Sequence, residues 1–383
     1  MNFHYTEEQR QLKNLAQKAA TQHIAPIVEK DEEDGHFRAE VIAELGKLGL
    51  TGIPASVDYD GAGLGYLEYA IALEEIAYRS SAYAISVAVS GLPQVILSVY
   101  GNEAQKKKYI PPLARGEHIG AFSLSESHSG SDAASLKTKA VKNGDHYILN
   151  GTKLWCTQGN VANTLIVFAR TGAEGPKGIS AFIIEKNMPG FKVGKLEHKM
   201  GIHISPTCEL ILENVKVPAE NLLGKEGDGF KIAMSALDSG RITIAASAVG
   251  LARAALEYSA KYARERKQFG DSIANFQGLQ FMMADMYTEL EAARLLVHRA
   301  AFLRDSQSPY SAEAASAKLF ATDMAMKLTT DAVQILGGAG YTKEYPVERY
   351  MREAKVLQIV EGTNQVQRVV IGRQIAQGLL PKV

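Results

Sequence analysis

The sequence predicts a mainly α-helical protein with a β domain in its middle. Three observations support this: helical periodicity from about residue 6 to about 118, apolar and polar alternation from about 123 to 217, and long alanine-rich helical segments after Gly229. Successive long helices of this kind form a bundle. We therefore expect an N-terminal helical domain at residues 1–118, a middle β domain at 119–228 and a C-terminal helical bundle at 229–383. A cleft is expected where the three domains meet.

Composition is that of an ordinary globular protein. Of 383 residues, 46% are hydrophobic and 22% charged, and the formal net charge is zero. No basic excess indicates a nucleic-acid partner, and Lys106-Lys107-Lys108 is better explained as a solvated helix face. The two cysteines, Cys156 and Cys208, make no disulfide framework and suit a reducing compartment, with a single bridge between them as the alternative.

The N-terminal region begins with a helix signal. Thr6 and Gln9 fit a capping box, and no signal-peptide core or Arg-rich leader precedes them. No segment is expected to be long and apolar enough to span a membrane. We predict a cytoplasmic protein, or a mitochondrial matrix protein with its leader removed. Further helical segments, interrupted at Gly61, Gly63 and Pro93, are expected at 40–50, 67–77 and 82–100.

Strands are expected in the middle region and helices after it. Asn150-Gly151 lies between alternating segments at 146–149 and 153–156, which predicts a hairpin. Further strands are predicted at 164–169, 179–185 and 208–217. A polar loop is expected at 305–311. The alanine-rich helices, favoured by the high helix propensity of alanine, are predicted at 232–265, 276–304, 312–336, 347–360 and 365–379.

Several common site signatures are missing from the sequence. There is no Rossmann or phosphate-loop glycine pattern and no G-x-S-x-G serine elbow. Gly337-Gly338-Ala339-Gly340 follows a helix, so its first interpretation is a helix stop. His198 and His203 lack convincing metal spacing and are expected to be exposed, so no metal site is predicted.

Glu361 is the strongest candidate for chemistry. It lies between an apolar helical segment and Gly362-Thr363-Asn364. A glycine after the acid permits a steep turn that can project the carboxylate into a cavity, where burial raises its pKa and strengthens it as a base. From this segment alone, the alternative is that Glu361 only ends a helix. A carboxylate without metal or nucleophile can abstract a proton, but harder chemistry requires a cofactor.

A set of motifs resembles those of acyl-CoA dehydrogenases. In family order, and through essentially the whole chain, they are FSLSE (122–126), SGSD (129–132), WCT (155–157), RERKQFG (264–270), QILGG (334–338), YPVER (345–349) and EGTNQVQ (361–367). The resemblance implies the family fold, which has an N-terminal α-helical domain, a β-barrel or sandwich as middle domain and a C-terminal four-helix bundle. It also implies an FAD enzyme whose electrons pass to an electron-transferring flavoprotein.

The resemblance gives Glu361 a specific role. The family glutamate removes the pro-R α-proton of an acyl-CoA thioester while the β-hydride leaves for flavin N5, which yields a trans-2-enoyl-CoA. Its backbone N–H, here that of Glu361, and a flavin hydroxyl bind the thioester oxygen, and Gly362 allows close approach. Another family branch carries its glutamate just before the arginine that matches Arg241. Gly240 occupies that position here, which favours the base at 361.

Cofactor and substrate contacts are implied residue by residue. Residues that resemble the isoalloxazine border are Phe122, Leu124, Ser125, Trp155 and Thr157; those that resemble contacts to the nucleotide half are Thr363 and Gln365. Gln268 occupies a position where some family members have a threonine near the flavin, so it is a further candidate for a cofactor contact. Residues that resemble contacts to a neighbouring subunit's FAD are Arg266, Phe269, Gln277, Gln334 and Gly338. These imply a homotetramer, a dimer of dimers. Predicted substrate contacts are Ser131, Leu237, Asp238, Arg241 and Gly362. The alternatives are a bundle-surface role for Arg241 and a structural role for Asp238. A hairpin-core role for Trp155 is a further interpretation, and it does not exclude a flavin contact, because a flat indole can pack on the β core and face a flavin together.

Departures from the family pattern are few. Ser127-His128 replaces a usual proline, which should loosen that loop, and Val360 stands where many members have tyrosine. The segment 92–99, Leu237 and Val360 are expected to set acyl specificity, and their apolar character favours an aliphatic tail. The alternative functions are an acyl-CoA oxidase or a dehydrogenase of carrier-bound acyl groups on the same fold. A catalytically silent acyl-CoA-binding protein is disfavoured, because Glu361, Arg241 and the flavin motifs are intact.

Overall fold

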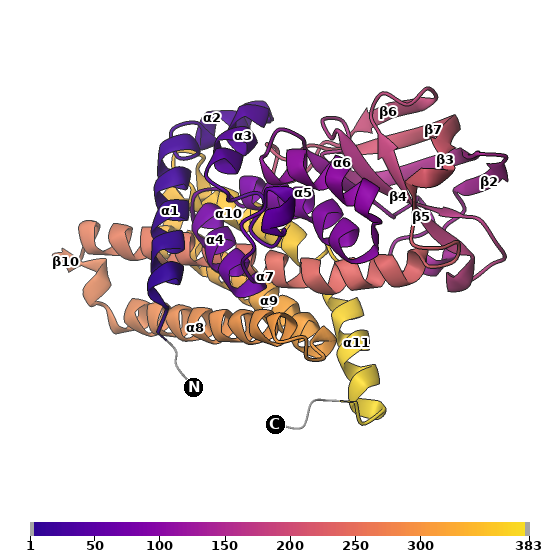
Figure 1. Ribbon diagram of the computed structural model, residues 1–383. Helices are drawn as coiled ribbons and strands as arrows, with labels where there is room; N and C mark the ends of the chain where they lie inside the picture. Colours follow the sequence, from indigo (N-terminus) through magenta and orange to yellow (C-terminus); the bar gives the residue numbers. More distant parts are fainter. Residues whose placement is uncertain (1–3, 380–383) are drawn as a thin grey trace.

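The computed structural model describes residues 4–379 and has a mixed β-sheet at one end of a helical body (Figure 1). The predicted outer limits of the first and last domains, at residues 1 and 383, lie outside the described residues. The first helices are α1 (Glu7–His23), α2 (Val28–Asp34), α3 (Ala39–Lys47), α4 (Tyr66–Arg79), α5 (Ser81–Tyr100) and α6 (Glu103–Ala114). The capping box is confirmed, because the Thr6 hydroxyl accepts from the Gln9 N–H and the Gln9 side chain accepts from the Thr6 N–H.

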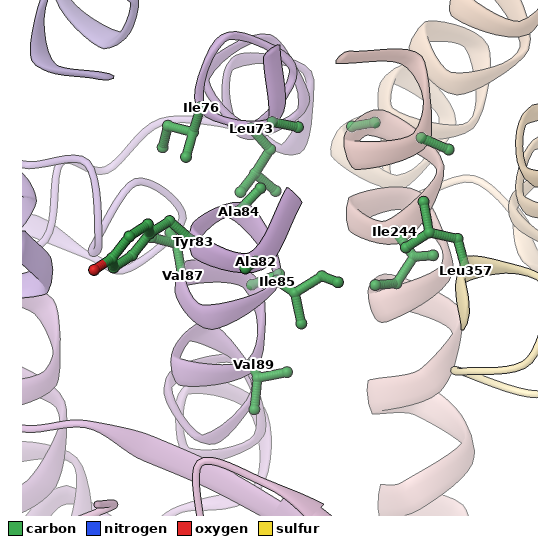
Figure 2. Close-up of a cluster of buried hydrophobic side chains, with 14 of the residues drawn as sticks. Leu73, Ile76, Ala82, Tyr83, Ala84, Ile85, Val87, Val89, Ile244 and Leu357 are labelled. Atoms are coloured by element: carbon green, nitrogen blue, oxygen red, sulfur yellow. The ribbon is translucent and has the colours of Figure 1, made fainter. Parts of the chain in front are cut away.

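Helix α5 corrects two predictions. Pro93 lies inside it and does not interrupt it. Among residues 4–379, this helix is long and apolar enough to cross a membrane by length and composition, although 83% of its most apolar window is buried in the fold. Figure 2 shows Tyr83, Val87 and other α5 side chains in a cluster with residues of α4 and α7. The helix is apolar around its circumference because neighbouring helices surround it.

The middle region forms an eight-stranded mixed sheet in the order β6-β7-β3-β2-β4-β5-β8, with β1 added in parallel to β4. Its strands are β1 (Gly120–Ser123), β2 (Lys139–Asn143), β3 (His146–Thr157), β4 (Thr164–Arg170), β5 (Ile179–Glu185), β6 (Phe191–Leu196), β7 (Thr207–Pro218) and β8 (Leu222–Leu223). The strands predicted from alternation in β4, β5 and β7 are confirmed.

The hairpin predicted at Asn150-Gly151 is wrong. The chain continues through this pair as part of β3, with register shifts against β7 between Leu149 and Gly151 and between Lys153 and Cys156. The turn lies earlier, at Gly144-Asp145, where Asn143 pairs with His146. Gly151 serves close packing instead, because a Cβ there would lie 2.4 Å from the Thr138 hydroxyl oxygen.

Long helices form the C-terminal bundle, as predicted. They are α7 (Gly229–Glu265), α8 (Gln277–Asp305), α9 (Ser311–Leu336), α10 (Val347–Leu357) and α11 (Asn364–Ala376), with β9 (Lys267–Gln268) and β10 (Asp271–Ser272) between α7 and α8. Helix α7 packs against α4, α5, α8, α9 and α10 (Figure 1). Helix α10 ends three residues earlier than predicted, which leaves residues 358–363 as the connection to α11.

Short 3-10 turns complete the secondary structure. They are η1 (Val57–Tyr59), η2 (Ala133–Ser135), η3 (Pro176–Gly178), η4 (Ala219–Asn221), η5 (Ile273–Asn275) and η6 (Gly337–Tyr341). Cys156 and Cys208 face each other across β3 and β7 as free, buried thiols. The alternative of a bridge between them is therefore not realised.

The two histidines near the end of β6 differ from each other. His198 is exposed as predicted. His203 is not: its ring nitrogens lie 3.0 Å from the Glu32 carbonyl and 2.8 Å from the Lys199 carbonyl, because Glu32 of α2 reaches this loop. Within residues 4–379, no cluster of three or more His, Cys, Asp or Glu side chains is arranged to hold a metal.

Candidate functional site

A cavity of about 610 Å³ lies where α5, the sheet, α7 and the 359–363 connection meet. Its wall brings together residues that are far apart in the sequence. Eleven of the predicted site residues line it: Phe122, Leu124, Ser125, Ser131, Trp155, Thr157, Leu237, Arg241, Glu361, Gly362 and Thr363. The structure therefore gathers the predicted flavin-border and substrate residues, with the predicted base, around one space.

The remaining predicted residues lie elsewhere. Asp238 is behind the wall, where it pairs with Arg241 and accepts from the Ser311 hydroxyl. Gln365 is exposed at the start of α11. Gln268 is exposed and does not line the cavity. The same holds for the residues that resemble contacts to a neighbouring subunit: Arg266, Phe269, Gln277, Gln334 and Gly338. Gly338 lies in η6, directly after α9.

Trp155 points into the cavity and not into the sheet core, so the hairpin-core interpretation is wrong. Its side chain is 60% exposed, and its φ of 60° is left-handed, which breaks the alternation of β3. Phe122 and Leu124 add apolar surface beside it, and Thr157 adds a hydroxyl. A flat indole beside apolar side chains and hydroxyl groups fits the isoalloxazine ring of FAD, which has an apolar face and polar edge atoms.

A buried ion pair supports this wall, and its lysine was not among the predicted site residues. Lys153 is fully buried, and its Nζ donates to the Leu124 carbonyl at 3.0 Å and to Glu126 at 2.8 Å. Glu126 also accepts from the N–H groups of Lys137 and Thr138. Burial lowers the pKa of Lys153 to about 8. The sequence feature that could have revealed this ion pair is a lysine at an inward-facing position of a strand whose other inward-facing residues are apolar.

The loop after Glu126 is tighter than expected. Glu126 and Ser129 exchange both backbone hydrogen bonds, at 2.9 and 3.1 Å, around Ser127-His128. The Ser129 hydroxyl also donates to the Asp132 carbonyl at 2.8 Å. The replacement of proline at 127 therefore leaves a closed turn and not a loosened loop.

Glu361 lies in a turn with unusual backbone geometry. Its φ is 54° and that of Gly362 is 84°, so two successive residues are left-handed. Such a conformation costs an ordinary residue roughly 1 kcal/mol and requires support from its surroundings. Gln367 supplies part of that support, because its Nε2 donates to the carbonyls of Glu361 and Gly362 at 3.0 and 2.7 Å. Thr363 then caps α11.

The Glu361 carboxyl lies on the cavity wall with a raised pKa. Burial raises its pKa to about 7, against the opposing effects of Arg241 and Lys318. Within residues 4–379, neither its buried Oε2 nor its backbone N–H has a hydrogen-bond partner. On α7, Gly240 faces it so closely that a Cβ would lie 2.5 Å from Oε2. The helix-end alternative therefore fails to account for the position of this side chain.

Arg241 is a cavity residue and not a bundle-surface residue. It is only 4% exposed, forms an ion pair with Asp238, and lines the cavity beside Glu361. Its Nε lacks a hydrogen-bond partner within the described residues, so donor capacity remains for a ligand. Two further basic residues near the site were not predicted: Lys318 behind the Glu361 turn, and Arg373 on the cavity wall.

The family models of the acyl-CoA dehydrogenase N-terminal, middle and C-terminal domains match residues 6–117, 121–215 and 227–376. The chain belongs to the acyl-CoA dehydrogenase family. It is 47% identical to the short-chain specific acyl-CoA dehydrogenase of Clostridium acetobutylicum, over 98% of this chain and 100% of that protein. The structure of butyryl-CoA dehydrogenase from Megasphaera elsdenii is 46% identical with a TM-score of 0.97, covering 98% and 100% of the two chains.

Two further relatives have names that refer to electron transfer or to reduction. A chain in a structure named for the electron transferring flavoprotein of Acidaminococcus fermentans and flavin-based electron bifurcation is 50% identical, with a TM-score of 0.96 and coverage of 98% and 99%. Acryloyl-CoA reductase (NADH) of Anaerotignum propionicum is 45% identical over 98% of this chain and 96% of that protein.

A relative with bound flavin agrees with the character of the cavity wall. The structure of a glutaryl-CoA dehydrogenase from Mycobacterium smegmatis in complex with FADH2 is 30% identical, with a TM-score of 0.93 and coverage of 99% and 97%. The predicted family, fold, enzyme class and FAD cofactor are confirmed. The chain is therefore an FAD-dependent oxidoreductase of this family.

Proposed function

We propose that this enzyme oxidises a short-chain saturated acyl-CoA to the trans-2-enoyl-CoA, with Glu361 as general base and an electron-transferring flavoprotein as electron acceptor. The observation that carries the proposal is the Glu361 carboxyl, which lines the cavity with an unpaired Oε2 and a pKa raised to about 7. A base with a pKa near the working pH combines a substantial ionised fraction with strong proton affinity.

The proposed step uses two groups of the same residue. A Glu361 carboxylate oxygen takes the α-proton, and the electrons of that C–H bond form the double bond to the β-carbon. The Glu361 N–H, without a partner among residues 4–379, donates to the thioester oxygen and stabilises the negative charge that develops there. When bound, FAD supplies the acceptor for the hydride that leaves the β-carbon.

The wall around Glu361 would orient the substrate. Leu92, Leu237 and Val360 offer an apolar surface to the acyl tail. Arg241 and the Ser131 loop would contact the CoA portion. The cavity must accommodate the flavin ring as well as the tail, which supports a short acyl chain, as do the names of the relatives from Clostridium and Megasphaera.

A homotetramer, a dimer of dimers, is part of the proposal. The residues expected to reach a neighbouring subunit's FAD are exposed on the bundle surface, with Phe269 96% exposed. Phe281, Phe302 and Tyr341 add further exposed apolar surface on α8 and η6. Contiguous exposed apolar patches mark interfaces, and these side chains would contribute to such a patch in the proposed tetramer. Light scattering of the purified holoenzyme tests the assembly. The domain limits 1–118, 119–228 and 229–383 and a cytoplasmic location also stay proposals.

A second candidate is the reverse reaction, reduction of an enoyl-CoA. The similarity to an NADH-dependent acryloyl-CoA reductase favours it. A Glu361 pKa of about 7 suits both directions, since the protonated acid can return a proton to the α-carbon. Comparison of rates with acyl-CoA plus the flavoprotein acceptor, and with enoyl-CoA plus the reduced flavoprotein, distinguishes the two directions.

Anaerobic titration with acyl-CoA thioesters of increasing length, followed by bleaching of the flavin absorbance, tests the reaction and the chain length together. We expect the short thioesters to bleach fastest, and Glu361→Gln to retain FAD and bind substrate while bleaching at least roughly a hundredfold more slowly. Normal bleaching by this variant would remove Glu361 from the reaction. Rapid peroxide formation in air would favour the oxidase alternative, and turnover only with a carrier-bound substrate would favour the carrier-bound one.

A further inference from the structure

Lys318 is a buried cation directly behind the turn that carries Glu361. It lies on α9 with 0% of its surface exposed. Its Nζ donates to the Gly362 carbonyl at 3.0 Å and to the Asn364 side-chain oxygen at 2.8 Å. Asn364 is held in turn by Thr322 and Asp323, at 2.9 and 2.6 Å. The lysine therefore joins α9 to both sides of the turn.

Lys318 differs in its pairing from the other charged residues near Glu361. On α7, Arg241 is paired with Asp238; between α9 and α11, Asp323 is paired with Arg368. No carboxylate within residues 4–379 forms a salt bridge with Lys318, and Glu361 is the carboxylate that acts on it most strongly. A buried ammonium group with only neutral acceptors needs an anion nearby to stabilise its charge. Glu361 supplies that anion.

We propose that Lys318 is a positioning residue for the reaction: it holds the Glu361–Asn364 turn so that the Glu361 carboxylate and N–H both face the substrate, and its charge favours the ionised form of Glu361. The proposal rests on the proposed function of Glu361 as the base. Gln367 shares the first task, because it donates to the same Gly362 carbonyl, but it carries no charge.

The directions of the pKa shifts of Lys318 and Glu361 agree with this geometry. Burial lowers the pKa of Lys318 to about 7 and raises that of Glu361 to about 7, while each opposes the shift of the other. Removal of the lysine charge should therefore raise the pKa of Glu361 further. Removal of Gln367 should disturb the turn and leave that pKa nearly unchanged.

The test compares Lys318→Gln, Lys318→Met and Lys318→Arg with Gln367→Met, a matched variant that loses hydrogen bonds to the turn but no charge. Thr329→Val, which removes a buried hydroxyl further along α9, controls for packing. The pH profile of flavin bleaching is measured for each holoenzyme. The carboxyl band of Glu361 is titrated in parallel by infrared difference spectroscopy, with Glu361→Gln as the reference that identifies the band.

We expect Lys318→Gln and Lys318→Met to move both midpoints upward by about one pH unit, the low end of the effect of a nearby opposite charge. Lys318→Arg should keep the midpoint, and Gln367→Met should lower the rate at every pH with an unchanged midpoint. Unchanged midpoints in both neutral variants would overturn the role of Lys318. If only the arginine variant folds, its infrared midpoint decides: a shift toward higher pH overturns the proposal. Normal bleaching by Glu361→Gln would instead overturn the proposed function.

Discussion

Gly240 of α7 lies against the carboxylate of Glu361, so closely that a Cβ on the glycine would sit 2.5 Å from Oε2. Two residues that are 121 positions apart in the sequence are therefore direct neighbours in the fold. Position 240 is also where the resemblance places the glutamate of another family branch. The proximity explains how a base at either position could reach the same substrate atom, and why this chain has a residue without a side chain opposite Glu361.

Substitution of Gly240 by alanine should lower the activity while the protein stays folded. Alanine favours the helix by about 1 kcal/mol over glycine, but its methyl group must displace the Glu361 carboxylate. We expect a folded enzyme that binds FAD and bleaches roughly tenfold to a hundredfold more slowly with a short-chain acyl-CoA. Gly372→Ala on α11, where a Cβ meets no atom within 4 Å, is the control. Equal rates for the two variants would contradict the steric argument.

The raised pKa of Glu361 should appear in the stability of the protein. Burial raises the pKa of this carboxyl in the folded protein to about 7, compared with roughly 4.3 for a free glutamate, so the cost of ionising it grows as the pH rises between these two values and is fully present above pH 7. Glu361→Gln should therefore raise the free energy of unfolding at pH 8 by on the order of 3 kcal/mol, and much less at pH 5. Urea denaturation at both pH values measures this difference. A gain of equal size at both would show that burial does not penalise the charge.

Trp155 should report FAD binding directly. It is the only tryptophan in the chain and is 60% exposed on the cavity wall. Addition of FAD to the apoprotein should quench its fluorescence, because the indole would contact the flavin. Trp155→Phe should still bind FAD, observed by flavin absorbance after gel filtration, and Trp155→Ala should bind it more weakly through loss of aromatic contact. Tryptophan emission unchanged by saturating FAD would place the flavin elsewhere.

Loss of the buried Lys153–Glu126 ion pair should destabilise the flavin wall. Lys153→Met leaves the Glu126 charge buried without its partner, which typically costs about 3–5 kcal/mol. Urea denaturation and FAD retention measure the effect. The double variant Lys153→Met with Glu126→Gln should recover much of the loss, since both charges are removed together. If the double variant is less stable than the single one, packing and not charge governs this site.

Much of the fold could be predicted because it follows from residue patterns within single helices and strands. The long helices of the bundle, the strands β4, β5 and β7, and the Thr6 capping box followed from periodicity and capping. The prediction failed where packing between distant segments overrides local preference. Asn150-Gly151 has the composition of a turn but lies inside β3, because pairing with β7 and close contact with Thr138 keep that segment extended.

The sequence by itself determined the order of helices and strands, the family motifs and the break at Glu361-Gly362, because each depends on neighbouring residues. Only the tertiary structure decided that Trp155 faces the cavity, that Gly240 meets the Glu361 carboxylate and that Lys318 lies behind the turn. These contacts join residues remote in the chain. They depend on burial and charge compensation within the packed core, which no local pattern in the sequence encodes.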